Sequence, residues 1–121
     1  MIEEFVATKI SKLFHVLSNE VRINIIYSLM ENESLTVTEL SEKLSIPQNT
    51  LSSHLKLLYE GSYIDKEQNW RNVNYSVREN KLYELFEIAL SILDDKWKGN
   101  WDKLNSAIRE LDKIANGNNK K

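Results

Sequence analysis

Small polar side chains gather on one side of a short segment that begins at Pro47. Apolar residues recur at helical spacing on its other side, at Leu51, Leu55 and Leu58. Amide side chains can read adenine edges, and hydroxyl or ammonium groups can contact bases or phosphates. The segment therefore predicts a helix that touches DNA, although an ordinary solvated helix face is the alternative. The candidate contacts are Gln48, Asn49, Thr50, Ser52, Ser53, His54 and Lys56.

His54 has three interpretations: a phosphate contact, a packed residue beside Leu55, or a metal ligand. The first two are favoured, because no partner ligand is visible. The chain has two histidines and no cysteine, which excludes disulfides and thiolate sites. Asp94 and Asp95 point apart on a helix, since successive residues are turned by about 100°. We expect no metal and no cofactor.

The elements before this segment complete a helix-turn-helix over residues 36–60. Thr36 and Glu39 form a T-x-x-E capping box, which predicts the start of a helix. Residues 45–47 are the turn, and Pro47 suits the first position of the next helix. Gly61 suits its end.

After Gly61 the apolar period changes from helical to alternating. Residues 63–67 and 73–77 read as two strands joined by a polar loop over 68–72. Trp70 and Arg71 lie near the loop tip. Arginine can read a narrow minor groove, so both residues are candidate DNA contacts, with a solvated hairpin tip as the alternative. The hairpin is predicted to be a wing, residues 63–77.

Long amphipathic segments flank this core. Residues 2–17 have a wide apolar face, and residues 80–115 show a heptad-like seam that Gly99 can divide into two helices. Aromatic seams of this kind usually pack, so we favour a homodimer interface over a ligand pocket. The candidate interface residues are Phe5, Ile10, Leu85, Ile92, Trp97, Trp101 and Leu104.

Length, charge and the N-terminal sequence restrict the number of domains, the affinity for nucleic acid and the cellular location. The 121 residues predict a single domain over 1–121. The net charge of −2 argues against broad nucleic-acid affinity, but residues 50–81 are mildly basic while residues 1–49 hold four Lys or Arg against seven Asp or Glu. The N-terminus lacks the basic start of a signal peptide, and no apolar run is long enough to span a membrane. We expect a cytoplasmic protein.

The order of these elements resembles the ArsR family of bacterial and archaeal repressors. Three segments carry the likeness: LSNEVRINIIYSL, the helix-turn-helix with its S-x-H-L element at Ser52, His54 and Leu55, and RNVNY in the second wing strand. They lie within residues 13–77. The resemblance implies a mainly α (α+β) winged helix-turn-helix with a β-hairpin wing and long N- and C-terminal dimerisation helices. Arg22 then occupies the place of a family arginine, and pairing with a carboxylate inside the fold is favoured over phosphate contact.

Departures from the family pattern concern sensing. Metal-sensing relatives have a cysteine pair in the third helix, where this chain has TELSEKL, and others use Asp and His on the fifth helix, whereas no histidine follows Asn80. Trp70 stands where the wing often has glycine. The resemblance thus implies a homodimeric, sequence-specific repressor on an inverted-repeat operator that does not sense metal through cysteine or histidine.

Two other functions are alternatives to this interpretation. One is a protein-interaction module that keeps the winged helix without binding DNA, which the acidic balance favours. The other is an enzyme, but the sequence has no recognisable nucleophile–base pair, phosphate-binding glycine loop or metal cluster. We therefore expect a DNA-binding regulator and not an enzyme.

Overall fold

The computed structural model describes residues 2–96 and 101–119, without the side chains of residues 94–96, 101–104, 115, 118 and 119. The chain divides into two compact units, Met1–Arg78 and Glu79–Lys121. Each unit is described by itself. That the chain is a single domain, as its length predicts, stays a prediction.

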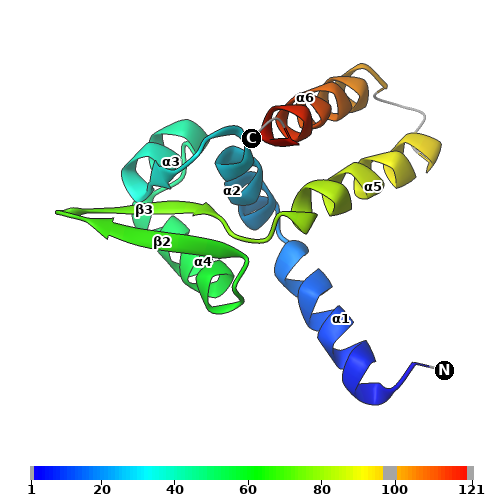
Figure 1. Cartoon of the computed structure of the whole chain (residues 1–121), viewed down its shortest axis with the longest axis horizontal. Helices are drawn as coiled ribbons and strands as arrows, with labels where there is room; N and C mark the ends of the chain where they lie inside the picture. The colour runs from blue at the N-terminus through cyan, green and yellow to red at the C-terminus, as the bar shows by residue number, and fades with distance from the viewer. Residues whose placement is uncertain (1, 97–100, 120–121) are drawn as a thin grey trace. The chain divides into compact units, whose positions relative to one another are not determined.

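The first unit contains four helices and the sheet. The helices are α1 (Glu4–Leu17), α2 (Glu20–Glu31), α3 (Val37–Leu44) and α4 (Gln48–Glu60) (Figure 1). Asn19 caps α2 by accepting a hydrogen bond from the Arg22 backbone N–H. Both hydrogen bonds of the Thr36–Glu39 capping box are present, which confirms the predicted start of α3.

Apolar residues from α2, α3, α4 and the sheet make one core. Those at 2% exposure or less are Ile25, Ile26, Leu29, Leu40, Leu51, Leu55, Leu58 and Ile64. The three leucines of α4 are thus buried, as their spacing predicts. Helix α1 has no buried residue, so it adds little to this core.

The sheet has three antiparallel strands in the order β1-β3-β2. They are β1 (Leu35–Thr36), β2 (Ile64–Asn69) and β3 (Asn72–Val77). The sequence predicted only the hairpin of β2 and β3, because a two-residue strand is too short to show alternation. Leu35 of β1 pairs with Tyr75, on the opposite edge of β3 from β2.

Two local details differ from the sequence prediction. The wing loop was expected over 68–72, but the ladder continues to Asn69 and Asn72 and leaves a two-residue turn, Trp70 and Arg71. Pro47 is the N-cap of α4 and not its first residue. Gly61 ends α4 as expected, with a negative φ; a Cβ there would lie 2.5 Å from a Tyr63 ring carbon, so a larger residue would require that ring to move.

The second unit contains α5 (Lys81–Lys96) and α6 (Trp101–Asn119). Leu82 and Leu111 are buried. Helix α6 continues four residues past the predicted end at 115, through Gly117. No helix among the described residues is long and apolar enough to cross a membrane.

Candidate nucleic-acid interface

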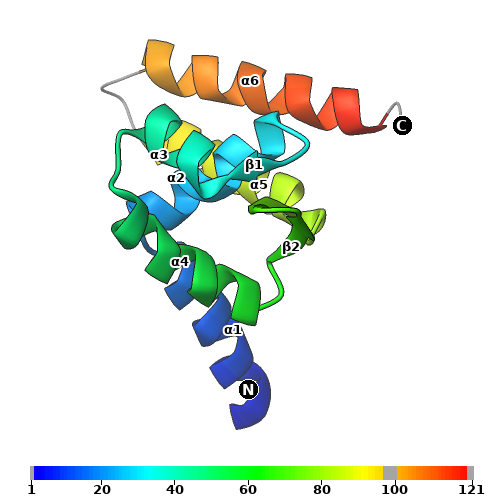
Figure 2. The same ribbon diagram turned by 90° about the vertical axis from the view of Figure 1, so that its left-hand side faces the viewer.

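Helix α4 presents one polar side to solvent. Its buried leucines lock the helix against the core, so the opposite side must face outward. We call this side the α4 flank. Its members, all exposed, are Gln48, Asn49, Thr50, Ser52, Ser53 and Lys56. In Figure 2, α4 passes in front of α1 and is joined to α3 by the turn between them.

Several side chains of the α4 flank are held by local hydrogen bonds. Ser52 and Ser53 donate to the backbone oxygens of Gln48 and Thr50, both at 2.9 Å. Their hydroxyl oxygens can still accept a hydrogen bond. The Asn49 side-chain oxygen accepts from the Thr50 N–H, which leaves its NH₂ group to donate. The flank therefore offers preset donors and acceptors.

Gln48 is positioned by a residue that the sequence did not single out. Its amide nitrogen donates to the Thr38 hydroxyl at 3.2 Å, so α3 steadies the first residue of α4. Thr38 is exposed near the start of α3. Spacing alone could not reveal this contact, because it joins residues ten positions apart across the turn.

His54 is half-buried and is not part of the open flank. Its Nδ1 lies 3.3 Å from Nη1 of Arg22, and because arginine only donates, this nitrogen accepts. Arg22 also donates to the carbonyl oxygens of Val16 and His15. These bonds tie the end of α1 and helix α2 to α4. Arg22 thus has structural contacts, but its partners in the described residues are carbonyl oxygens and His54 and not the carboxylate that the sequence analysis expected.

The wing residues lie apart from the core. Trp70 is 93% exposed and Arg71 is exposed beside it. The hairpin extends well beyond α3 and α4 (Figure 1). Trp70 has a φ of +60°, although bulky residues rarely adopt positive φ. The structure thus brings Trp70 and Arg71 together at the tip and separates them from the α4 flank.

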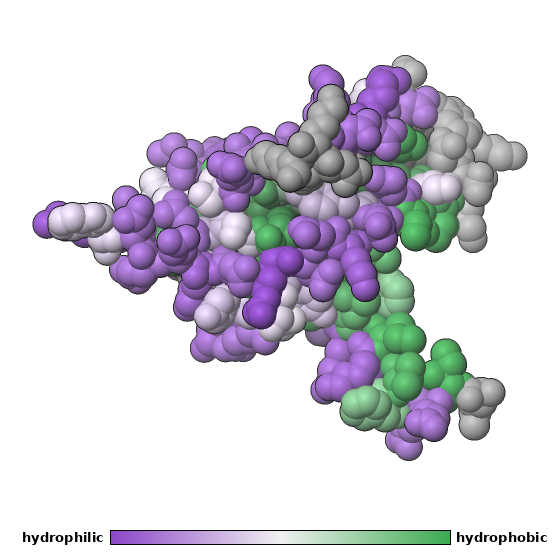
Figure 3. Space-filling view, viewed as in Figure 1, coloured by the Kyte–Doolittle hydropathy of each residue, from purple (hydrophilic) through white to green (hydrophobic). Residues whose placement is uncertain are grey.

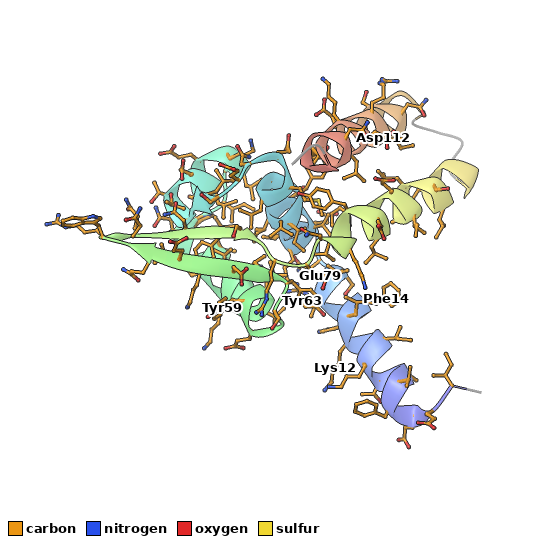
Figure 4. All side chains as sticks on the ribbon, in the orientation of Figure 1. Lys12, Phe14, Tyr59, Tyr63, Glu79 and Asp112 are labelled. Carbon is orange, nitrogen blue, oxygen red and sulfur yellow. The ribbon has the colours of Figure 1, made fainter. Side chains whose placement is uncertain are left out.

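Positive charge on this unit is only partly neutralised. Arg78 lies 3.7 Å from Asp65, and the Lys66 ammonium lies 4.3 Å from the centre of the Tyr59 ring. Figure 4 labels Tyr59 near the end of α4. Within the described part of the chain, Lys56 and Arg71 form no ion pair. Both cations are therefore available to phosphate groups.

The candidate dimer residues divide into two sets. In the first unit, Phe5 and Ile10 of α1 are 69% and 42% exposed. In the second unit, Ile92 is 51% exposed and Leu85 is half-buried. Trp97 and the side chains of Trp101 and Leu104 lie outside the described residues.

The sequence prediction of the interface omitted further exposed apolar residues. They are Ile2, Val6 and Phe14 on or before α1, and Ile88 and Leu93 on α5. Their helical spacing in the sequence indicates that they share one face of a helix. It does not indicate whether the rest of the fold buries that face. Figure 3 shows apolar residues gathered along α1, and in Figure 4 Lys12 and Phe14 leave α1 on opposite sides.

Metal-binding side chains do not converge in the described residues. No group of three His, Asp or Glu there could hold a metal ion, and the sequence has no cysteine. His54 is engaged with Arg22 instead.

Comparison with known proteins identifies the family. Residues 19–66 match the model of the bacterial regulatory proteins of the arsR family. The arsenical resistance operon repressor of Escherichia coli is 31% identical over 102 residues, which cover 83% of this chain and 82% of that protein. The chain belongs to the ArsR family. This ArsR-family protein is therefore a transcriptional regulator with a winged helix DNA-binding fold, and not an enzyme.

Solved structures share the fold. The transcriptional repressor BigR from Xylella fastidiosa superposes with a TM-score of 0.65 at 29% identity, covering 74% of this chain and 90% of that one. A homodimeric winged helix-turn-helix DNA-binding domain from Mycobacterium bovis has a TM-score of 0.68 at 16% identity, covering 81% and 94%. The predicted winged helix-turn-helix of the ArsR-family protein is thus confirmed.

Proposed function

We propose that this ArsR-family protein is a homodimeric repressor that binds an inverted repeat in duplex DNA. Each protomer places the α4 flank in a major groove, and the two-fold axis places the second copy in the next groove, about one helical turn away. Trp70 and Arg71 of the wing contact the flanking DNA. Binding at a promoter would exclude the polymerase. The protein acts in the cytoplasm.

The observation that carries this proposal is the exposure of the α4 flank. Six exposed polar side chains share the solvent side of a helix that is anchored by buried leucines. Because a single helix reads only a few base pairs, a dimer is needed for specificity. Exposed apolar side chains on α1 supply surface for such a dimer, since α1 has no buried residue of its own.

The effector, if one is used, is not bound through thiolates or a histidine pair. The chain has no cysteine, and one of its two histidines is engaged with Arg22. The name of the Escherichia coli relative links that protein to arsenical resistance. If this protein responds to arsenicals, it does so without cysteine ligands.

A direct test selects genomic DNA fragments with the purified full chain and sequences those retained. Fluorescence anisotropy then measures affinity for a selected fragment and for a scrambled one, at low and at moderate salt. We expect an inverted repeat among the selected fragments, a preference of at least about 10³-fold over the scrambled duplex, and weaker binding as salt rises. Equal affinity for both duplexes at both salt concentrations would contradict the proposal.

A further inference from the structure

Trp70 is the most exposed large apolar side chain in the described part of the chain. At 93% exposure the indole contacts almost nothing in its own protein. The next most exposed side chain of this class is Phe5, at 69%. Water contact over so much apolar surface is unfavourable, so Trp70 does not contribute to the stability of the fold.

The backbone at this position is also unfavourable for tryptophan. Trp70 is the first residue of a two-residue hairpin turn, and its φ is +60°. Glycine, asparagine or aspartate would adopt this conformation at lower cost. Gln68 steadies the turn by donating from its amide nitrogen to the Trp70 backbone oxygen at 3.1 Å. Neither packing nor turn geometry explains why tryptophan is found here.

The support beneath Trp70 suits a projecting side chain. Six consecutive residue pairs join β2 and β3, from Ile64 with Val77 to Asn69 with Asn72. This ladder continues up to the turn, so it forms a stiff two-stranded ribbon. Arg71, exposed and without an ion pair among the described residues, lies next to the indole. The tip thus combines a flat apolar ring with an available cation.

We propose that Trp70 is a wedge that enters the minor groove beside the site read by α4 and partly separates two stacked base pairs. The inference rests on the proposed function and specifies what the wing does there. The indole stacks on a base while Arg71 contacts a neighbouring phosphate. Apolar wedges of this kind bend the duplex by roughly 20–90° toward the major groove. The protein would therefore bend its operator.

The experiment uses the full chain and a fragment chosen by the selection described above. Anisotropy measures affinity, and energy transfer between dyes at the two duplex ends measures bending. We compare the wild type with Trp70→Ala, Trp70→Phe and Trp70→Gly; Glu67→Ala in β2, also exposed, is the matched wing control. Trp70→Ala should weaken binding on the order of 10-fold and remove most of the bend. Trp70→Phe should keep most of both.

Trp70→Gly separates folding from DNA contact. Glycine accepts the positive φ, so this variant should melt no lower than the wild type, yet bind and bend DNA as poorly as Trp70→Ala. A second readout is the emission of Trp70 itself, with Trp97 and Trp101 replaced by phenylalanine. Operator DNA should quench that emission and protect it from acrylamide.

The outcomes distinguish the two proposals. If the wild type binds no duplex specifically, the proposed function fails and the wedge fails with it. If the wild type binds but Trp70→Ala binds and bends equally, the wedge is overturned while DNA binding stands. Loss of bending in Glu67→Ala as well would also overturn it, because the effect would then belong to the hairpin and not to the indole. If Trp70→Ala keeps DNA affinity and bending but no longer binds another protein that the wild type binds, then Trp70 contacts a protein and the wedge is wrong.

Discussion

Two exposed surfaces of the first unit differ in what lies beneath them. The α4 flank is polar, and behind it Leu51, Leu55 and Leu58 are almost fully buried. Helix α1 is apolar on its exposed face and has no buried residue. The α4 flank is formed by one chain alone, and its exposed polar side chains can hydrogen-bond to a polar ligand. The second is unfavourable in water until another apolar surface covers it. This difference is why we propose DNA as the ligand of the α4 flank and a second copy of the chain as the partner of α1.

The largest expected effect comes from charging the α1 surface. Phe5→Glu combined with Ile10→Glu should yield monomers in sedimentation velocity, because burying carboxylates in an apolar interface is costly. Operator affinity should fall more than about 10²-fold, since one protomer contacts only half of the site. Ser11→Glu, exposed on α1 and turned by about 100° or more from both residues, is the matched control. Dimers with wild-type affinity would place the interface elsewhere.

In the variant with Phe5→Glu and Ile10→Glu, shortening a buried side chain should lower the free energy of unfolding more than shortening an exposed one. Leu55→Ala removes a buried side chain and should lower the free energy of unfolding by about 2–5 kcal/mol. Val6→Ala, at 41% exposure, should change it by less than about 1 kcal/mol. Urea unfolding followed by circular dichroism measures both. Similar losses would mean that α1 packs on its own protomer.

The α4 flank should determine specificity more than total affinity. Asn49→Ala with Ser53→Ala should weaken binding to the selected operator by about 1–3 kcal/mol per lost base contact and leave binding to scrambled DNA almost unchanged. Anisotropy titrations on both duplexes measure this. Equal losses on the two duplexes would argue against base readout by these residues.

Arg71 should act through charge. Arg71→Ala should weaken binding and reduce the slope of log affinity against log salt by about one, because one phosphate contact is lost. Titrations between low and moderate salt give the slope, with Arg78→Ala as a control already paired to Asp65. An unaltered slope would remove Arg71 from the interface.

The smallest effect should follow addition of zinc, cadmium or peroxide. None should change operator affinity by more than about twofold, because the chain offers no thiolate and the described residues offer no cluster of metal ligands. The same anisotropy assay with and without each agent is sufficient. A large response would show that the sensing site uses ligands other than those expected.

The sequence predicted the elements that local chemistry determines. The T-x-x-E pair, the leucine spacing of α4 and the alternation at Val73, Tyr75 and Val77 each report on a few neighbouring residues. These rules hold because caps and amphipathic faces form within one or two turns. They were enough to locate the helix-turn-helix, the wing and the residues of the α4 flank.

Features that depend on distant residues were not predictable. Strand β1 exists because Leu35 and Thr36 find partners in β3, about 40 positions away. The Arg22–His54 contact joins residues 32 positions apart, and helical spacing alone left open whether His54 would be exposed or half-buried, as it is. The length of the wing turn depended on how far the ladder continued. Turn propensity could not give it, because tryptophan is uncommon at positive φ.

Thr36 belongs to strand β1 and also caps helix α3. Through β1 it is hydrogen-bonded to β3 of the wing, and through α3 it is linked to Gln48 at the start of α4. These links connect the hairpin to the helix that we propose reads DNA. In the proposed complex they would hold the distance between the wing tip and the α4 flank constant, and half-sites of another length would then bind less well.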